Sequence, residues 1–94
     1  MAIVVVTDKS IKTDVAATAA TSSLALVAGT VYRFISTTAC WIKQGATPTA
    51  SAASGSMFVA ANEVVYIDGR NGAGLSVIRN AADGTSTLTP CQEI

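Results

Sequence analysis

Cys40 and Cys91 carry the two thiols of this chain, and a thiol can act as a nucleophile or as a soft metal ligand. A catalytic cysteine needs a neighbouring base that favours its thiolate, and histidine is the usual one. The chain contains no histidine, which also removes the commonest general base and the commonest metal ligand. We therefore predict neither catalysis nor a metal site at these two thiols.

The glycines and acidic residues form no other motif that carries chemistry. The seven glycines fall in predicted turns, and no glycine-rich loop opens a helix that could hold a phosphate. The stretch 68–74 superficially resembles an oxygen-ligand loop, but it lacks the alternating acids and the distal glutamate of a calcium site. We interpret it as a hairpin turn, and we expect no cofactor and no enzymatic activity.

Charge is scarce and balanced, with six basic and six acidic residues. A nucleic-acid surface needs clustered cations, so we expect no nucleic-acid partner. Weak self-repulsion suits a subunit that packs against others, although it also fits an ordinary low-charge soluble protein. No run reaches the ~18–20 apolar residues of a membrane span, and the apolar run 2–6 is too short for a signal peptide. These features predict synthesis in the cytoplasm and no membrane partner.

The two cysteines leave two alternatives open. A Cys40–Cys91 bridge would close a loop of about fifty residues and would stabilise the chain by roughly 4 kcal/mol in the chain-entropy model. Synthesis in a reducing cytoplasm favours two buried free thiols instead. A bridge that forms after release into an oxidising medium is the alternative.

Short apolar runs separated by turn residues dominate the rest of the chain. The residues favour strands over 2–7, 24–27, 30–37, 40–43, 56–61, 64–67, 75–79 and 85–89. Asn71-Gly72 and Asp83-Gly84 are typical hairpin turns. The 94 residues make one domain, which we predict to be all-β: a single antiparallel β-sandwich or small jelly-roll-like barrel of about seven to eight short strands.

Within this domain, residues 1–23 are predicted to form an N-terminal strand and an extended arm, and residues 24–94 the sandwich. The Ala/Thr-rich segment 11–23 is interpreted as irregular or weakly extended. A helix over 14–20 is less favoured because no large apolar residue recurs there at helical spacing. Pro90 lacks an amide donor and is expected to stop strand pairing, which would leave 91–94 as a short tail.

Three segments are candidates for an interface. The first strand, with Ile3, Val4, Val5 and Val6, is either internal or donated to a neighbouring subunit by edge pairing. Trp41 is interpreted as a core or interface anchor rather than a platform for sugar stacking. The loop from Gly45 to Gly55, with Pro48 and Thr49, is expected to meet a neighbour. In the following strand, Met57 or Phe58 is expected to point inward.

The order of motifs resembles a group of short virion-associated proteins of tailed bacteriophages. The similar blocks span 30–89, about two-thirds of the chain, and lie in this order: Trp41-Ile42-x-x-Gly45-x-x-Pro48-x-Ala50, Gly55-Ser56-x-Phe58-Val59-x-Ala61, Glu63-x-x-Tyr66-Ile67, Leu75-x-Val77-Ile78, Asp83-Gly84-Thr85 and Thr87-Leu88-Thr89. The chain departs from that pattern at Cys40, at Cys91 and in its last five residues, and its first thirty residues match nothing specific.

This resemblance implies a compact β-sandwich that binds the phage particle, as a decoration or cement protein on the capsid surface. The expected partners are the major capsid protein, or another virion protein, and further copies of the same chain in a homo-oligomer. The same parts would suit a head–tail connector or tail accessory protein. From another class, a carbohydrate-binding module of a host-attachment spike would use Trp41, Tyr66 and the loop 68–74.

Overall fold

The chain forms β-strands, along which successive side chains point to opposite faces. The computed structural model describes residues 3–5, 10–21, 26–45, 48–51, 55–69 and 74–93. Within these residues there is no helix, and the strands are β1 (Ile3–Val5), β2 (Ile11–Val15), β3 (Ala20–Thr21), β4 (Val31–Ser36), β5 (Cys40–Gly45), β6 (Met57–Val59), β7 (Val65–Asp68), β8 (Gly74–Arg79) and β9 (Gly84–Glu93).

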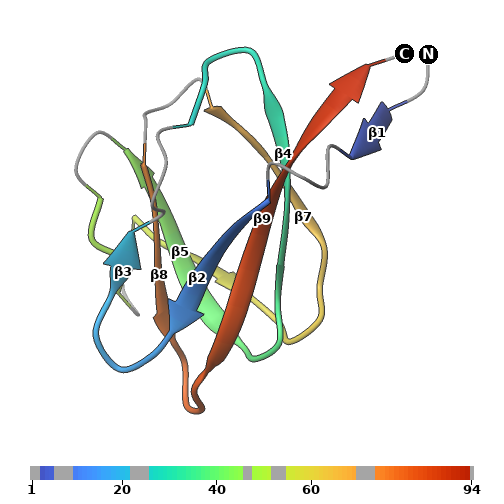
Figure 1. Cartoon of the computed structure of the whole chain (residues 1–94). Helices are drawn as coiled ribbons and strands as arrows, with labels where there is room; N and C mark the ends of the chain where they lie inside the picture. Colours follow the sequence, from blue (N-terminus) through green and yellow to red (C-terminus); the bar gives the residue numbers. More distant parts are fainter. Residues whose placement is uncertain are drawn as a thin grey trace.

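The strands form two antiparallel sheets (Figure 1). Sheet A has the order β1-β9-β4-β7, and β2 also pairs with β9 on the side that β1 takes. Sheet B has the order β3-β8-β5-β6. Two antiparallel sheets facing each other confirm the predicted all-β sandwich.

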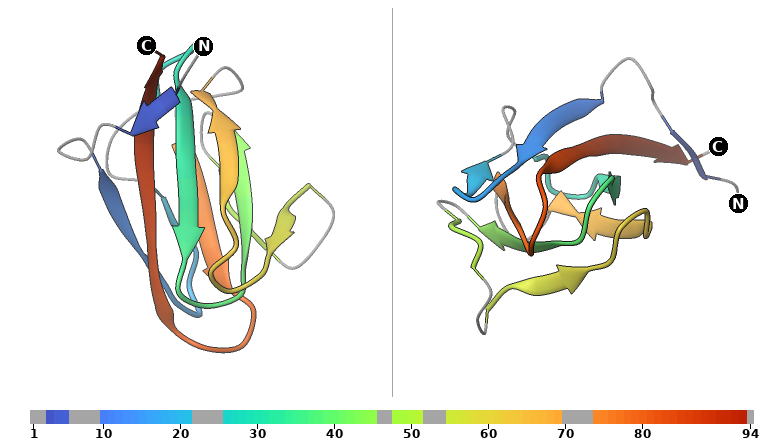
Figure 2. Two further views of the ribbon diagram at one scale, coloured as in Figure 1. Left: turned by 90° about the vertical axis from the view of Figure 1, so that its right-hand side faces the viewer. Right: turned by 90° about the horizontal axis from the view of Figure 1, so that it is seen from below.

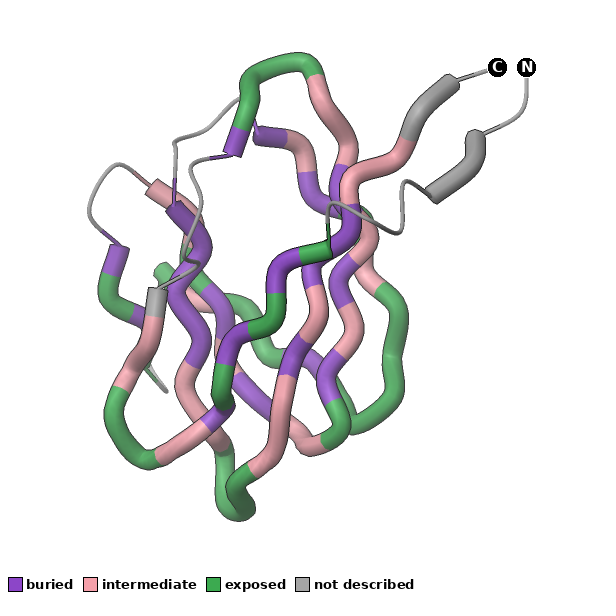
Figure 3. Tube along the Cα trace, viewed as in Figure 1, coloured by how far each residue is buried: buried purple, intermediate pink, exposed green. Residues whose placement is uncertain are grey.

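The core lies between the sheets and is supplied by alternate residues of each strand. In β4, Tyr32, Phe34 and Ser36 are buried while the residues between them are only half-buried. From the facing sheet, Ile42 and Val77 lie directly opposite each other in the register and are both buried. Figure 3 shows this change of burial along the strands. Residues two apart share a face of a strand, so this pattern requires one buried face per sheet.

The segment predicted as an arm is extended, but it is a strand of the sheet. In β2, Ile11, Thr13 and Val15 are buried and the two residues between them are exposed. Every β2 residue has a partner on β9, and Ser86 Oγ donates to the Thr13 carbonyl oxygen at 2.9 Å. The prediction of an irregular arm was wrong here because the β-branched residues Ile11, Thr13 and Val15 recur at every second position, which suits a half-buried strand.

Pro90 does not stop strand pairing, contrary to the prediction. β9 continues to Glu93, and Pro90 lies opposite Tyr32 of β4. On its other side, β2 pairs as far as Leu88 and β1 begins at Cys91. Pro90 therefore lies in the interval between two partner strands, where a missing amide donor disrupts no pairing on that side.

The prediction of a strand over 24–27 also changes. The expected strand 24–27 falls partly outside the described residues, and Leu26 and Val27 belong to no strand. Leu26 is buried, and the Val27 amide donates to the Tyr32 hydroxyl at 2.9 Å. This segment therefore contacts the core as a loop and not as part of a ladder. Among the described residues, no helix is long and apolar enough to cross a membrane.

The two long sides of the sandwich differ. On one side the chain passes from β2 in sheet A to β3 in sheet B, and the Arg79 amide donates to the Ala16 carbonyl oxygen at 3.0 Å. On the other side the edges are β7 of sheet A and β6 of sheet B. β6 has only three residues and pairs with only the first half of β5, from Cys40 to Ile42. This side of the sandwich is consequently open.

Candidate binding surface

A cleft of about 540 Å³ occupies the open side of the sandwich. Its lining residues come from β5, β6, β7 and β8 and the turn before β6: Ile42, Lys43, Gln44, Gly55, Ser56, Met57, Val65, Tyr66, Ile67, Asp68 and Leu75. Ile42, Ile67 and Leu75 belong to the core, and Val65 packs against it. The cleft therefore gives access to the apolar interior along the β7 edge, and its volume is in the range typical of binding sites.

A side-chain hydrogen bond marks one end of this cleft. Gln44 Nε2 on β5 donates to the backbone carbonyl oxygen of Asp68 on β7 at 2.6 Å. This bond joins the two sheets across their open side. Beyond it, Gly69 follows β7 and donates its amide to the Thr30 carbonyl oxygen at 3.0 Å.

Most of the exposed large apolar side chains come from a single stretch of chain beside the cleft. Four of the five in the described residues lie between 57 and 66: Met57 (48% exposed), Phe58 (46%), Val64 (38%) and Tyr66 (62%). We call Met57, Phe58 and Val64 the β6–β7 surface. Met57 lies on the same face of β6 as the buried Val59 and lines the cleft, as expected of one of the two residues, but it stays 48% exposed because β6 is a short edge strand, and Phe58 lies on the outer face.

Trp41 extends this apolar region on the outer face of sheet B. It lies between the buried Cys40 and Ile42, and its cross-strand partner is Phe58. The two rings meet edge to face, with centroids 5.3 Å apart and an interplanar angle of 66°. Trp41 Nε1 donates to Asn80 Oδ1 at 3.2 Å, which fixes the indole. Trp41 is thus half-buried at the surface, and it is not a plug in the core between the sheets.

The other predicted interface residues fall in separate places. Ile3, Val4 and Val5 form β1 at the end of β9, and Val6 lies outside the described residues. Thr49 is exposed, but Pro48 and Ala50 are buried, and the Ala50 amide donates to Ser76 Oγ at 2.9 Å. The described part of this loop therefore covers the outer face of sheet B. Pro48 is buried within the chain itself, and its part in an interface stays a prediction.

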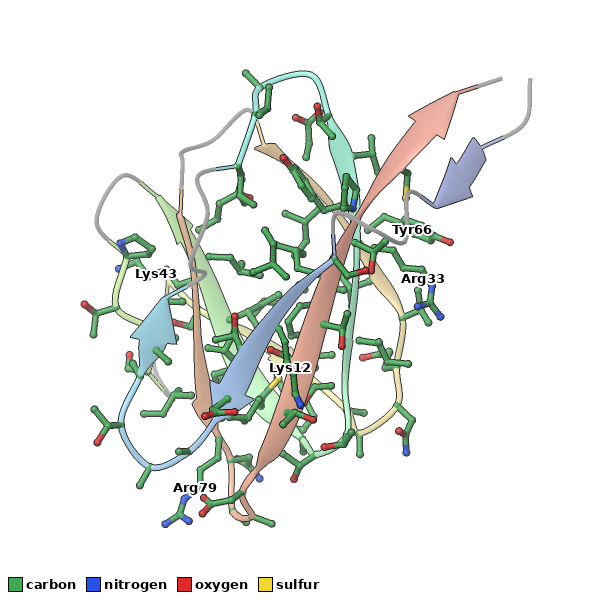
Figure 4. All side chains as sticks on the ribbon, in the orientation of Figure 1. Lys12, Arg33, Lys43, Tyr66 and Arg79 are labelled. Atoms are coloured by element: carbon green, nitrogen blue, oxygen red, sulfur yellow. The ribbon has the colours of Figure 1, made fainter. Side chains whose placement is uncertain are left out.

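The proposed sugar-binding residues do not come together. Tyr66 is paired with Arg33 on the outer face of sheet A, and Figure 4 shows these two side chains near each other. Trp41 lies on the outer face of sheet B. The loop residues 70–73 lie outside the described residues. A sugar platform needs an aromatic face and polar groups that converge on one ligand, and Trp41 and Tyr66 do not converge.

The two cysteines are separate free thiols, one in each sheet. The bridge that their spacing allowed is thus not formed. Cys40 is buried, whereas Cys91 is half-buried and contacts the Thr89 carbonyl oxygen at 3.9 Å, so only Cys40 matches the expected buried thiol. Burial raises the pKa of the Cys40 thiol above its ordinary value of 9.0, and a hydrogen bond with Ser36 offsets part of that rise. A raised pKa removes the thiolate that a nucleophile needs.

The raised pKa of Cys40 predicts a loss of stability in alkaline solution. The folded chain holds this proton more tightly than the unfolded chain, so the contribution is complete below pH 9.0 and falls as pH rises through the folded pKa. Urea unfolding of the wild type and of Cys40→Ala, compared between about pH 8 and pH 10, should show a steeper decline for the wild type. Parallel declines would contradict the assignment.

Potential metal ligands do not gather in the described part of the chain: no group of three or more His, Cys, Asp or Glu residues lies close enough there to hold an ion. Sequence reasoning missed the surface exposure of Met57 and Val64. Their signal was weak, because an exposed apolar residue on an edge strand has the same sequence pattern as a buried one. Val64 lies two residues after Asn62, whose φ of 63° is left-handed.

Comparisons with known proteins add no relative. No family model matches the chain, and neither a curated protein nor a solved structure matches it significantly.

Proposed function

We propose that this chain is a non-enzymatic structural protein of a tailed-bacteriophage virion. It binds the capsid surface as a decoration or cement protein and stabilises the head by bridging neighbouring capsid subunits. The resemblance over residues 30–89 supplies the biological context, and the sandwich provides the rigid scaffold that such a role requires. Its partners are the major capsid protein, or another virion protein, and further copies of itself.

The observation that carries this proposal is the β6–β7 surface. Met57, Phe58 and Val64 are each more than a third exposed, and the half-buried Trp41 packs against Phe58. Aromatic residues and methionine are enriched in protein interfaces. Their burial against a capsid protein needs no cofactor and no charge complementarity.

Low charge supports the same role. The chain has a formal net charge of zero at pH 7 with only twelve charged side chains. Many copies can therefore be placed close together on a shell with little mutual repulsion. The ion pair between Arg79 Nη1 and Asp83 Oδ1, 2.7 Å apart, is exposed at the β8–β9 turn and contributes little to the stability of the fold.

The proposal is tested by binding the purified protein to heads of the phage that encodes it. The Met57→Ser, Val64→Ser double variant should bind at least about tenfold more weakly than wild type, which corresponds to the loss of interface anchors. Val27→Ser is the matched control, because Val27 is 60% exposed but belongs to the loop before β4. It should bind as the wild type does, and all three proteins should unfold at similar temperatures.

Electron cryomicroscopy of the loaded particles then separates the two structural roles. Copies spread over the whole shell support a decoration protein. Copies confined to one vertex, or absence from the sedimented heads, would overturn it, and the vertex position would instead favour the connector or tail accessory role. Equal binding by the double variant and the control would show that the β6–β7 surface is not the contact.

A further inference from the structure

One edge of sheet A is formed by β1 and β2, which both pair with β9, and the other edge is β7. The left-hand view of Figure 2 shows β9, β4 and β7 side by side, with β1 crossing in front of the end of β9. Within the described residues, β1 pairs only with β9, and β7 pairs only with β4. Figure 1 shows β1 and the end of β9 projecting together from the body of the sandwich. Each edge strand therefore offers one side on which a further strand can be added.

Strand directions in sheet A permit the two edges to meet between copies. Every neighbouring pair is antiparallel, so directions alternate from β1 through β9 and β4 to β7, and the two edge strands run in opposite directions. A second copy in the same orientation thus places its β7 antiparallel to β1 of the first. This contact continues sheet A from one molecule into the next without any change of fold.

The β7 edge directs backbone groups toward such a neighbour. The Gly69 amide donates to Thr30 on the β4 side, so alternation turns the amide and carbonyl of Tyr66 to the opposite side. The Asp68 carbonyl also points there, since it accepts the bond from Gln44. No described strand lies on that side of Tyr66. Tyr66 is therefore the centre of the available edge, and Gln44 bounds it at one end.

Both faces of this edge carry apolar side chains beside polar ones. On the inner face lies the cleft, with Met57, Val65 and Ile67 in its lining together with Lys43, Gln44 and Asp68. On the outer face lies the Tyr66 side chain, which is 62% exposed. A strand added here needs apolar residues at successive positions to cover both, and Ile3-Val4-Val5 is such a sequence.

We propose that copies of this chain associate head to tail, with β1 of one molecule added to β7 of the next and lying over the cleft. This inference deepens the proposed function, on which it rests for the context of a virion oligomer. A head-to-tail contact uses two different surfaces of each copy. It gives a ring if the rotation between copies closes and a filament if it does not. The zero net charge leaves little repulsion to oppose it.

Crosslinking tests the contact directly. Two preparations both carry Cys91→Ser, and one also carries Val4→Cys while the other carries Tyr66→Cys. A short bis-maleimide should link the two preparations to each other after mixing, and should link neither one to itself. Cys91→Ser alone is the control, since its remaining thiol, Cys40, is buried. Links between two Val4→Cys chains, or no links where the wild type is oligomeric, would overturn the proposal.

Sedimentation of edge variants gives a second readout. Tyr66→Pro removes the outward amide, and proline is tolerated on an edge strand at such a position. It should weaken self-association at least about tenfold, whereas Tyr66→Thr keeps the amide and should retain most of it. Circular dichroism checks that both are folded. If Tyr66→Pro does not fold, the crosslinks decide.

The two proposals fail separately. A wild type that is monomeric in solution and still coats heads overturns the head-to-tail contact and leaves the proposed function standing. A wild type that forms β1–β7 crosslinks but does not bind heads supports the contact and overturns the capsid role.

Discussion

Replacing Phe34 by alanine is expected to lower the free energy of unfolding by about 3–5 kcal/mol. Phe34 is the largest fully buried side chain of the described residues, and it lies in the middle of β4 between β7 and β9. Its cross-strand partners are Val65 and Leu88, so truncation opens a cavity that neither sheet can close. Domains of this size are stable by about 5–15 kcal/mol, so the loss is a large share of the total.

Phe58→Ala is the matched control, because it removes the same atoms from a side chain that is 46% exposed. Its cost should be well below that of Phe34→Ala and should come mainly from the lost ring contact with Trp41, which is about 0.5–1.5 kcal/mol for an aromatic pair. Urea unfolding measures both variants. Equal losses would show that the core is not centred on β4.

Replacing Gly69 by alanine is expected to destabilise the fold by about 1–3 kcal/mol or more. A Cβ atom at position 69 would overlap the Val27 carbonyl oxygen and lie 2.7 Å from the Val27 carbonyl carbon. These are backbone atoms, which no rotamer change can move away. The loop before β4 would have to shift, and its hydrogen bond from the Val27 amide to Tyr32 would be strained with it.

Gly45→Ala provides the comparison. A Cβ atom there would meet only Pro48 Cβ at 3.9 Å, which is ordinary van der Waals contact. Thermal unfolding should therefore place Gly45→Ala near the wild type and Gly69→Ala several degrees below it. A Gly69→Ala protein as stable as the wild type would mean that residues 26–30 move freely away from Gly69.

The strands of this chain were predictable where local sequence and pairing agree. Tyr32 and Phe34 alternate with less apolar neighbours, and Asp83-Gly84 marks a tight turn, so β4 and the start of β9 follow from the residues alone. β2 and the end of β9 were not predictable in this way. Thr13 and Pro90 occupy positions that a partner strand makes favourable, and the partner is distant in sequence.

The candidate surface was predictable only in part. Trp41 was correctly placed on a strand. Gly45 was correctly interpreted as the end of that strand. Burial of Pro48 depends on the loop covering the outer face of sheet B, and exposure of Met57 depends on β6 being a short edge strand. The cleft itself arises because β6 stops after three residues, and strand length at an edge leaves little trace in sequence.

The central position of β9 has a consequence for biosynthesis. β9 joins β1, β2 and β4 into one sheet, yet it follows them in sequence, and the bond from Ser86 to Thr13 spans 73 residues. Sheet A therefore cannot be completed on the ribosome until residues 84–93 have emerged; until then β1 and β2 have no partner in it, whereas β4 can already pair with β7. Such non-local pairing is typical of domains that fold in milliseconds to seconds. Slower elongation during synthesis of β9 would prolong the interval in which the apolar faces of β1 and β2 are exposed to aggregation.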